Sequence, residues 1–230
     1  MLELFSPDWF TRADILIEVF SFIVLLTFFI ISIKNYKLTK NKKLLMLGIG
    51  FFLISIAELA TILTKFVLYY KTTLIQNFGN IIVQYSSLHS SDLPYDLGFF
   101  MYKLFTLGGL YIIYRLHLKN RNFGDVILSA LFIIIASLAG QMIYYVFHIT
   151  VLVLLGLIIS EYNQIYEKNK SKNTKMLVSS FFILAVGQAF FILSNLKIAY
   201  VIGQLLQLIS YLIFLAIIIK INKNGWSKRN

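Results

Sequence analysis

Seven windows of the chain are dominated by apolar residues, and polar residues gather mainly in the segments between them. A helix that crosses a bilayer needs roughly 17 to 25 mostly apolar residues. The windows that meet this need are 13–33, 44–69, 97–116, 125–140, 142–160, 176–194 and 199–220. The pattern predicts an all-α, polytopic membrane protein, a single domain of seven transmembrane helices over residues 1–230.

The fourth and fifth windows are nearly continuous, since only Ala139, Gly140 and Gln141 interrupt them. The segments that flank this pair, 115–121 and 168–175, are both basic. Basic loops gather on the cytoplasmic side of a membrane, so both segments should lie on one side. This arrangement requires an even number of crossings between them, and we therefore predict a tight hairpin at Gly140.

Composition and charge agree with a membrane location. The chain is 59% hydrophobic and only 13% charged, whereas soluble proteins are about 25% charged. Most of its 21 Lys and Arg residues fall in segments that the predicted topology places on one side, which accounts for the net charge of +11 without a nucleic-acid partner. This distribution predicts a multi-pass protein of the cell membrane with its N-terminus outside and its C-terminus inside.

The longest predicted connection is an outer loop over residues 71–96. Its pattern is compatible with a β-hairpin that turns at 77–80, with an amphipathic helix on the membrane surface, or with an ordered spacer. Either of the first two would form a lid. His89, Asp92 and Asp96 lie in this loop, but nothing in their spacing indicates a ligand geometry, so we predict no metal site.

Six predicted helices carry a polar side chain at a similar depth, near the outer boundary of the hydrocarbon core, given a rise of about 1.5 Å per residue. These residues are Glu18, Glu58, Lys103, His148, Gln188 and Gln204. A charge at a helix centre costs about 2.5 to 3.5 kcal/mol on insertion scales, so such groups usually face a partner or a water-filled cavity. We predict an outward-facing pocket that binds a small polar ligand. Lys65 lies nearer the surface and is expected to snorkel to the interface.

The alternative is that this polar layer only packs the helices together. Interhelical hydrogen bonds in membrane bundles contribute about 0.6 kcal/mol on average, and Glu18, Glu58 and Lys103 would then satisfy one another. Small residues would allow the helices to approach closely, at Gly48, Gly108, Gly156, Gly187 and Gly203.

A weak internal repeat relates the two ends of the chain. An offset of 130 residues aligns 51–65 with 181–195, and an offset of 101 residues aligns the third helix with the seventh. The polar pairs that result are Glu58 with Gln188, Glu18 with His148, and Lys103 with Gln204. The registers predict a 3+1+3 parallel pseudo-repeat around a lone fourth helix, an organisation known for transporters with parallel repeats.

Several chemistries lack their required residues. The sequence contains no HExxH and no GxSxG motif. A b-type haem bundle normally needs two facing histidines, and His148 is the only histidine in a predicted span. The last span carries no lysine between Lys197 and Lys220 for a retinal, and the chain has no cysteine. We therefore expect no enzymatic activity and no cofactor.

The run IEVFSFIVLLTFFIISIKNYKLTKNKKLLMLGIGFFLISIAELATIL, residues 17–63, resembles the opening of the seven-helix membrane-associated sensor regions of prokaryotic signalling proteins. The whole chain is similar to small uncharacterised archaeal seven-span membrane proteins. The resemblance implies a receptor-like or sensory protein that signals through a separate cytoplasmic or membrane partner. A small transporter with Glu58 or His148 as a proton site is the alternative, and a purely structural membrane protein is the third.

Overall fold

The computed structural model describes residues 6, 7, 9–77, 93–116 and 123–227. Within these ranges the chain forms seven α-helices and no β-strand. They are α1 (Thr11–Thr39), α2 (Lys42–Asn77), α4 (Leu93–Arg115), α5 (Phe123–Met142), α6 (Tyr144–Asn169), α7 (Lys172–Ile192) and α8 (Lys197–Ser227). All seven are long and apolar enough to cross a bilayer, which confirms the predicted set of helices.

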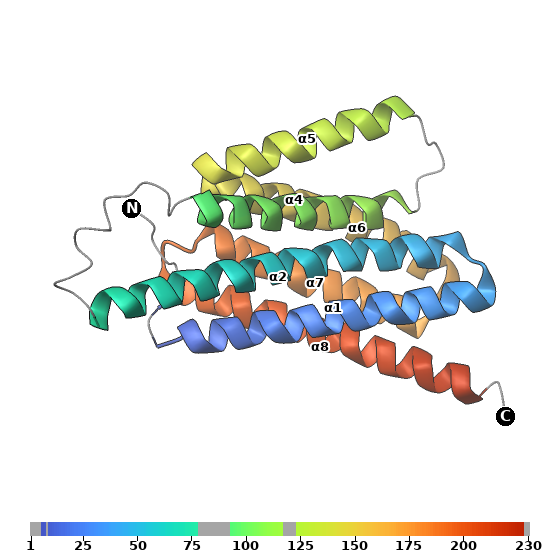
Figure 1. The fold of residues 1–230 in the computed structure, drawn as a ribbon. Helices are drawn as coiled ribbons and strands as arrows, with labels where there is room; N and C mark the ends of the chain where they lie inside the picture. Colours follow the sequence, from blue (N-terminus) through green and yellow to red (C-terminus); the bar gives the residue numbers. More distant parts are fainter. Residues whose placement is uncertain (1–5, 8, 78–92, 117–122, 228–230) are drawn as a thin grey trace.

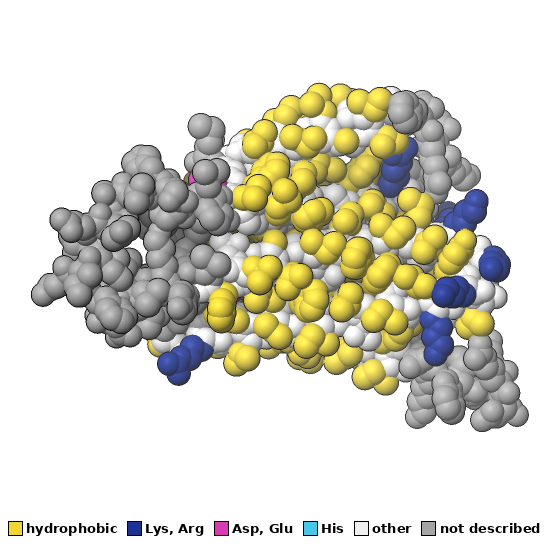
Figure 2. Space-filling model, viewed as in Figure 1, with side chains coloured by type: hydrophobic (Ala, Val, Ile, Leu, Met, Phe, Trp, Pro, Cys, Tyr) yellow, Lys and Arg dark blue, Asp and Glu magenta, His cyan; other side chains and the backbone are white. Residues whose placement is uncertain are grey.

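The surface of the bundle matches a lipid environment. Apolar side chains cover the middle of the face shown in Figure 2, and Lys and Arg side chains gather mainly at the end that holds the α1–α2 turn. On α5, large side chains such as Leu128 and Phe132 are more than half exposed. Helices suit this setting because each one satisfies its backbone hydrogen bonds internally, where no water is present to do so.

By their packing, six of the seven described helices form a ring, and α5 lies outside it, at one edge of the bundle in Figure 1. Around the ring, each helix packs against two neighbours, in the order α1, α2, α4, α6, α7, α8 and back to α1. Helix α5 packs against α4 and α6. The ring encloses an apolar core that includes five buried phenylalanines, among them Phe28, Phe51, Phe181 and Phe214.

Two helices end in the same way. The residues that follow α1 and α6, Lys40 and Lys170, both have a left-handed backbone, with φ of 55° and 46°. Their backbone N–H groups donate to Tyr36 O and Tyr166 O, each at 2.7 Å. A left-handed residue of this kind satisfies a free carbonyl of the last helical turn and stops the helix.

The predicted hairpin between the fourth and fifth spans is present, but it turns at Ile143 and not at Gly140. Ile143 is extended, and its N–H donates to Ala139 O at 2.8 Å. Gly140 lies three residues before Ile143, at a close contact where an added Cβ would be 3.0 Å from Phe147 Cβ. A glycine at this position lets α6 pack closely against α5. The turn itself lies further along the chain.

Helix α2 continues through Asn77, which overturns the first arm of the predicted β-hairpin. Continuing the helix keeps the backbone groups bonded, whereas an isolated two-stranded hairpin is marginally stable at best. Residues 78–92, which include His89 and Asp92, lie outside the described residues. Asp96 lies in the first turn of α4.

Glycines allow close helix contacts, at positions that only partly agree with prediction. A Cβ on Gly48 would lie 2.7 Å from Ser32 Cβ, and one on Gly203 would lie 2.8 Å from the Phe191 ring. Gly187 is also tightly packed, whereas a Cβ on Gly108 would make only an ordinary contact with Leu53 and Gly156 has open space beside it.

Candidate functional site

The six polar residues predicted to share one depth are all buried, but they do not meet in one group. The structure distributes them over four sets of contacts. Glu18 and Gln204 belong to a cluster around Lys65, Glu58 bonds to Gln207 and Tyr211, His148 lies against Gln188, and Lys103 bonds to the backbone of Gly140.

The prediction that Lys65 snorkels to the interface is wrong. Only 8% of the residue is exposed, and its Nζ donates to Asp14 Oδ2 at 2.6 Å and to Glu18 Oε1 at 2.5 Å. Asp14 and Glu18 are four residues apart on α1, so they present two carboxylates on the same helix face. Two adjacent anions in the bundle stabilise a buried ammonium, and the lysine does not need to reach water.

Tyr200 on α8 connects this cluster, which we call the Lys65 cluster (Asp14, Glu18, Lys65, Tyr200 and Gln204). Its hydroxyl donates to Asp14 Oδ2 at 2.9 Å and accepts from Gln204 Nε2 at 3.0 Å and from Lys65 Nζ at 3.3 Å. Three helices, α1, α2 and α8, are thereby joined by charge and hydrogen bonding inside the apolar zone.

The Tyr200→Phe variant should lower the free energy of unfolding by about 1 to 3 kcal/mol, because it leaves buried polar groups without a partner. Thermal unfolding in detergent, followed by circular dichroism, measures the change. Tyr145→Phe is the matched control, since Tyr145 is exposed and its hydroxyl accepts a long bond, 3.3 Å, from Asn195 Nδ2. Equal midpoints for the two variants would contradict the connecting role of Tyr200.

The Lys65 cluster has more acceptors than donors. It combines two carboxylates with one ammonium group. Glu18 Oε2 and Gln204 Oε1 are both buried and have no hydrogen-bond donor among the described residues. Buried polar atoms are nearly always paired with protein or with ordered water, so these two oxygens are suited to accept from water or from a bound proton.

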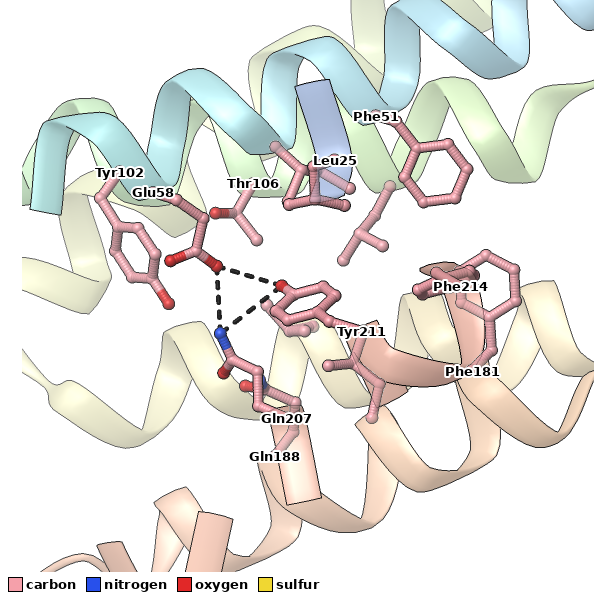
Figure 3. A pocket seen from close by; sticks show the side chains of 14 residues that line it. Leu25, Phe51, Glu58, Tyr102, Thr106, Phe181, Gln188, Gln207, Tyr211 and Phe214 are labelled. Atoms are coloured by element: carbon pink, nitrogen blue, oxygen red, sulfur yellow. Dashed lines mark hydrogen bonds between the residues drawn. The ribbon is translucent and has the colours of Figure 1, made fainter. Parts of the chain in front are cut away.

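Glu58 occupies a separate site in the middle of the bundle. Its Oε1 accepts from Gln207 Nε2 and from Tyr211 OH, both at 3.0 Å, and Figure 3 shows these three side chains facing one another. No cationic side chain pairs with Glu58 in the described part of the chain. Only 3% of the residue is exposed, and the hydrogen bonds to its carboxylate come from neutral side chains.

A cavity of about 30 Å³ lies beside Glu58 (Figure 3). Tyr102, Thr106, Gln188 and Gln207 line it together with Glu58, and phenylalanine rings line the opposite end. A polar cavity above about 10 to 15 Å³ holds a water molecule. The hydroxyl of Thr106 is buried and unpartnered among the described residues, which leaves a hydrogen-bonding group available to a small occupant.

The other two predicted residues have local partners. His148 Nδ1 lies 2.8 Å from Gln188 Oε1, a distance at which the ring N–H donates to the amide carbonyl. Lys103 Nζ donates to Gly140 O at 2.8 Å. This carbonyl belongs to the last turn of α5, where helix carbonyls have no partner within the helix, so Lys103 caps α5.

Four residues that form bonds in these sites were missed from the sequence, namely Asp14, Tyr200, Gln207 and Tyr211. A signal exists for the three on α8, because together with Gln204 they recur at intervals of three or four residues along that helix. This spacing places all four on one helix face. The prediction considered only one polar residue per helix. It therefore overlooked that one face of α8 carries four polar residues, which contact both the Lys65 cluster and Glu58.

Comparisons with models of protein families, with curated proteins and with solved structures gave no match to this chain. The function of the chain is therefore inferred from the contacts within its own bundle.

Proposed function

We propose that the chain is a small membrane transporter that moves a small cation, the proton included, through a central site at Glu58. The observation that carries the proposal is the buried Glu58 carboxylate beside a water-sized cavity, with neutral hydrogen bonds and no cationic partner among the described residues. An unpaired buried charge costs several kcal/mol. Binding a proton or a small cation removes this cost, whereas a cavity of about 30 Å³ has no room for an organic ligand.

The proposed architecture is a 3+1+3 parallel repeat, with α1, α2 and α4 as one half, α6, α7 and α8 as the other, and α5 between them. Helix ends support it. The caps at Lys40 and Lys170 are 130 residues apart, and α2 and α7 both begin two residues later, at Lys42 and Lys172. The order of neighbours around the ring is also the same in each half.

Close contacts between helices support the same registers. In the first half, α2 and α4 approach at Gly50 and Gly109, where a Cβ on Gly109 would lie 2.6 Å from Gly50 O. The offsets of 130 and 101 residues equate these positions with Ser180 and Ser210. In the second half these serines join α7 and α8, and each hydroxyl donates to the other's carbonyl, at 3.1 and 2.9 Å.

The central cavity would then lie between equivalent residues. Under the same registers, its lining includes five matched pairs: Phe51 and Phe181, Ile54 and Leu184, Glu58 and Gln188, Thr106 and Gln207, and Leu110 and Tyr211. The rings of Phe51 and Phe181 are nearly parallel, at an interplanar angle of 8°. A site between two such halves is suited to alternating access, because relative motion of the halves opens it to one end at a time.

The proposed orientation in the cell membrane has the N-terminus outside and the C-terminus inside. Lysine and arginine side chains at the end that holds the α1–α2 turn support it, because such residues favour the cytoplasmic side (Figure 2). The Lys65 cluster would then lie toward the outer side of the membrane.

The proposal is tested by ion flux into liposomes that contain the purified protein and a trapped pH-sensitive dye. A potassium diffusion potential drives the flux, and a second series replaces the dye by a sodium-sensitive one. We expect flux above protein-free liposomes, and Glu58→Gln should reduce it to that background. Glu167→Gln, the same chemical change at an exposed side chain, is the matched control and should leave the flux unchanged.

Absence of flux from the unaltered protein, or equal flux from the Glu58→Gln and Glu167→Gln variants, would overturn the transport proposal. The receptor-like and the purely structural roles would then remain, since neither a sensor, which binds its ligand and changes its packing, nor a structural protein passes a solute across the membrane.

A further inference from the structure

A second, larger cavity lies in the same bundle, near the α1–α2 and α6–α7 turns. Its volume is about 140 Å³, which is room for several water molecules. Ser32 and Asn35 on α1 and Asn173 and Thr174 on α7 supply hydroxyl and amide groups to its wall. No charged side chain lines it in the described part of the chain, so the cavity suits water and small hydrated species.

Only one layer of side chains separates the two cavities. Five helices contribute to both walls, and on four of them the nearest lining residues are three or four positions apart. These pairs are Leu25 and Phe28 on α1, Leu47 and Phe51 on α2, Leu177 and Phe181 on α7, and Phe214 and Ile217 on α8. Such a spacing is about one helical turn, or about 5.4 Å along the axis.

Four phenylalanines fill this boundary, and we call them the phenylalanine layer (Phe28, Phe51, Phe181 and Phe214). Phe28 lines the second cavity and the other three line the central one. The centroids are 4.2 Å apart for Phe28 and Phe51, 5.2 Å for Phe51 and Phe214, and 5.3 Å for Phe181 and Phe214. All four are buried, and Figure 3 shows three of them at the end of the central cavity away from Glu58.

We infer that the second cavity is the inner end of the path from Glu58, and that the phenylalanine layer is the gate between them. This inference rests on the proposed transport function. A dry apolar constriction excludes water and ions until it widens, which is how hydrophobic gates work in channels. The lining groups of the second cavity would receive the small hydrated cation once it has passed the layer.

The composition of the layer explains how it opens. Phe28 and Phe51 belong to α1 and α2, in the first half, whereas Phe181 and Phe214 belong to α7 and α8, in the second. A movement of one half relative to the other therefore pulls the two pairs of rings apart. The same movement joins the two cavities, because no further layer lies between their walls.

The test uses the absence of native cysteines, which makes a single introduced thiol specific. Thr106→Cys places a thiol in the central cavity, and its reaction with a small cationic methanethiosulfonate reagent is followed in detergent. We expect slow reaction in this variant and an increase of about tenfold or more when Phe214→Ala is added, because removing a ring admits water and reagent. Filling the second cavity with Thr174→Phe should cancel most of the increase.

Phe147→Ala is the matched control, since Phe147 is equally buried, at 1% exposed, but lines neither cavity. Phe28→Ala replaces Phe214→Ala if the latter does not fold. Asn173→Cys should react rapidly both with and without Phe214→Ala. Equal rates with Phe214→Ala and Phe147→Ala, no effect of Thr174→Phe, or an unreactive Asn173→Cys would each overturn the gate.

The labelling experiment does not depend on the flux experiment. If the labelling rate of Thr106→Cys depends on the phenylalanine layer but the protein shows no ion flux, the gate is retained and the transport proposal is rejected. Flux that is lost in Glu58→Gln, together with labelling that does not depend on the phenylalanine layer, would retain the transport proposal and reject the gate.

Discussion

Replacing Lys65 by methionine is expected to destabilise the bundle by about 3 to 5 kcal/mol, the cost of leaving a buried charge without its partner. Lys65 is the only cation that pairs with Asp14 and Glu18 in the described part of the chain. Methionine preserves much of the side-chain volume, so the loss reports charge and hydrogen bonding more than packing. Thermal unfolding of the purified protein in detergent measures the effect as a lower midpoint.

A compensating variant shows whether charge is the cause. Adding Asp14→Asn and Glu18→Gln to Lys65→Met removes the unpaired anions, and we expect it to recover part of the lost stability through coupling between contacting residues. Lys170→Met is the control, because Lys170 is exposed and pairs with Glu167 on the surface, where an ion pair contributes little. A Lys65→Met protein as stable as the Lys170→Met protein would contradict the account of the cluster.

Gly109→Ala is expected to destabilise the contact between α2 and α4 by about 1 to 3 kcal/mol, as overpacking does in a well-filled core. An added Cβ would lie 2.6 Å from Gly50 O, which belongs to backbone and does not rotate away. The two helices would have to separate, and the apolar contacts on both sides of the crossing would loosen. Thermal unfolding and the yield of monodisperse protein report the change.

Gly108→Ala provides a control one residue away. Its added Cβ would meet only Leu53 Cδ1, at 3.9 Å, which is an ordinary contact. Alanine is also the better helix former, so this variant should be neutral or slightly stabilised. Similar losses from Gly108→Ala and Gly109→Ala would show that glycine is needed for its flexibility, and would refute a close backbone approach at Gly109.

Buried polar groups have two distinct roles in this bundle. The Lys65 cluster has its own internal counter-charge, so its main expected effect is on stability. Glu58 has hydrogen bonds but no counter-charge among the described residues, so its main expected effect is on the proposed transport. The pairing of Glu18, Glu58 and Lys103 expected for a purely structural layer does not occur, because Lys65 pairs with Glu18 and Lys103 caps α5.

The apolar pattern of the chain is enough to set the number and approximate position of the seven helices in the described residues. Apolar windows are sufficient because a segment in lipid must satisfy its backbone hydrogen bonds within itself, and the helix does so from local sequence alone. The burial of Glu18, Glu58, Lys103, His148, Gln188 and Gln204 also follows from the sequence, because polar side chains at that depth are costly in lipid and face the interior of the bundle.

Which polar groups meet depends on how the helices pack in three dimensions. Depth does not specify the direction in which a side chain points around its helix, nor which helix lies opposite. Lys65 was expected to extend to the membrane interface, but it pairs with two carboxylates on α1. Gln207 and Tyr211 bond to Glu58 from α8, which is far along the chain from α2. These partners are set by contacts between distant helices, and such contacts depend on the whole bundle.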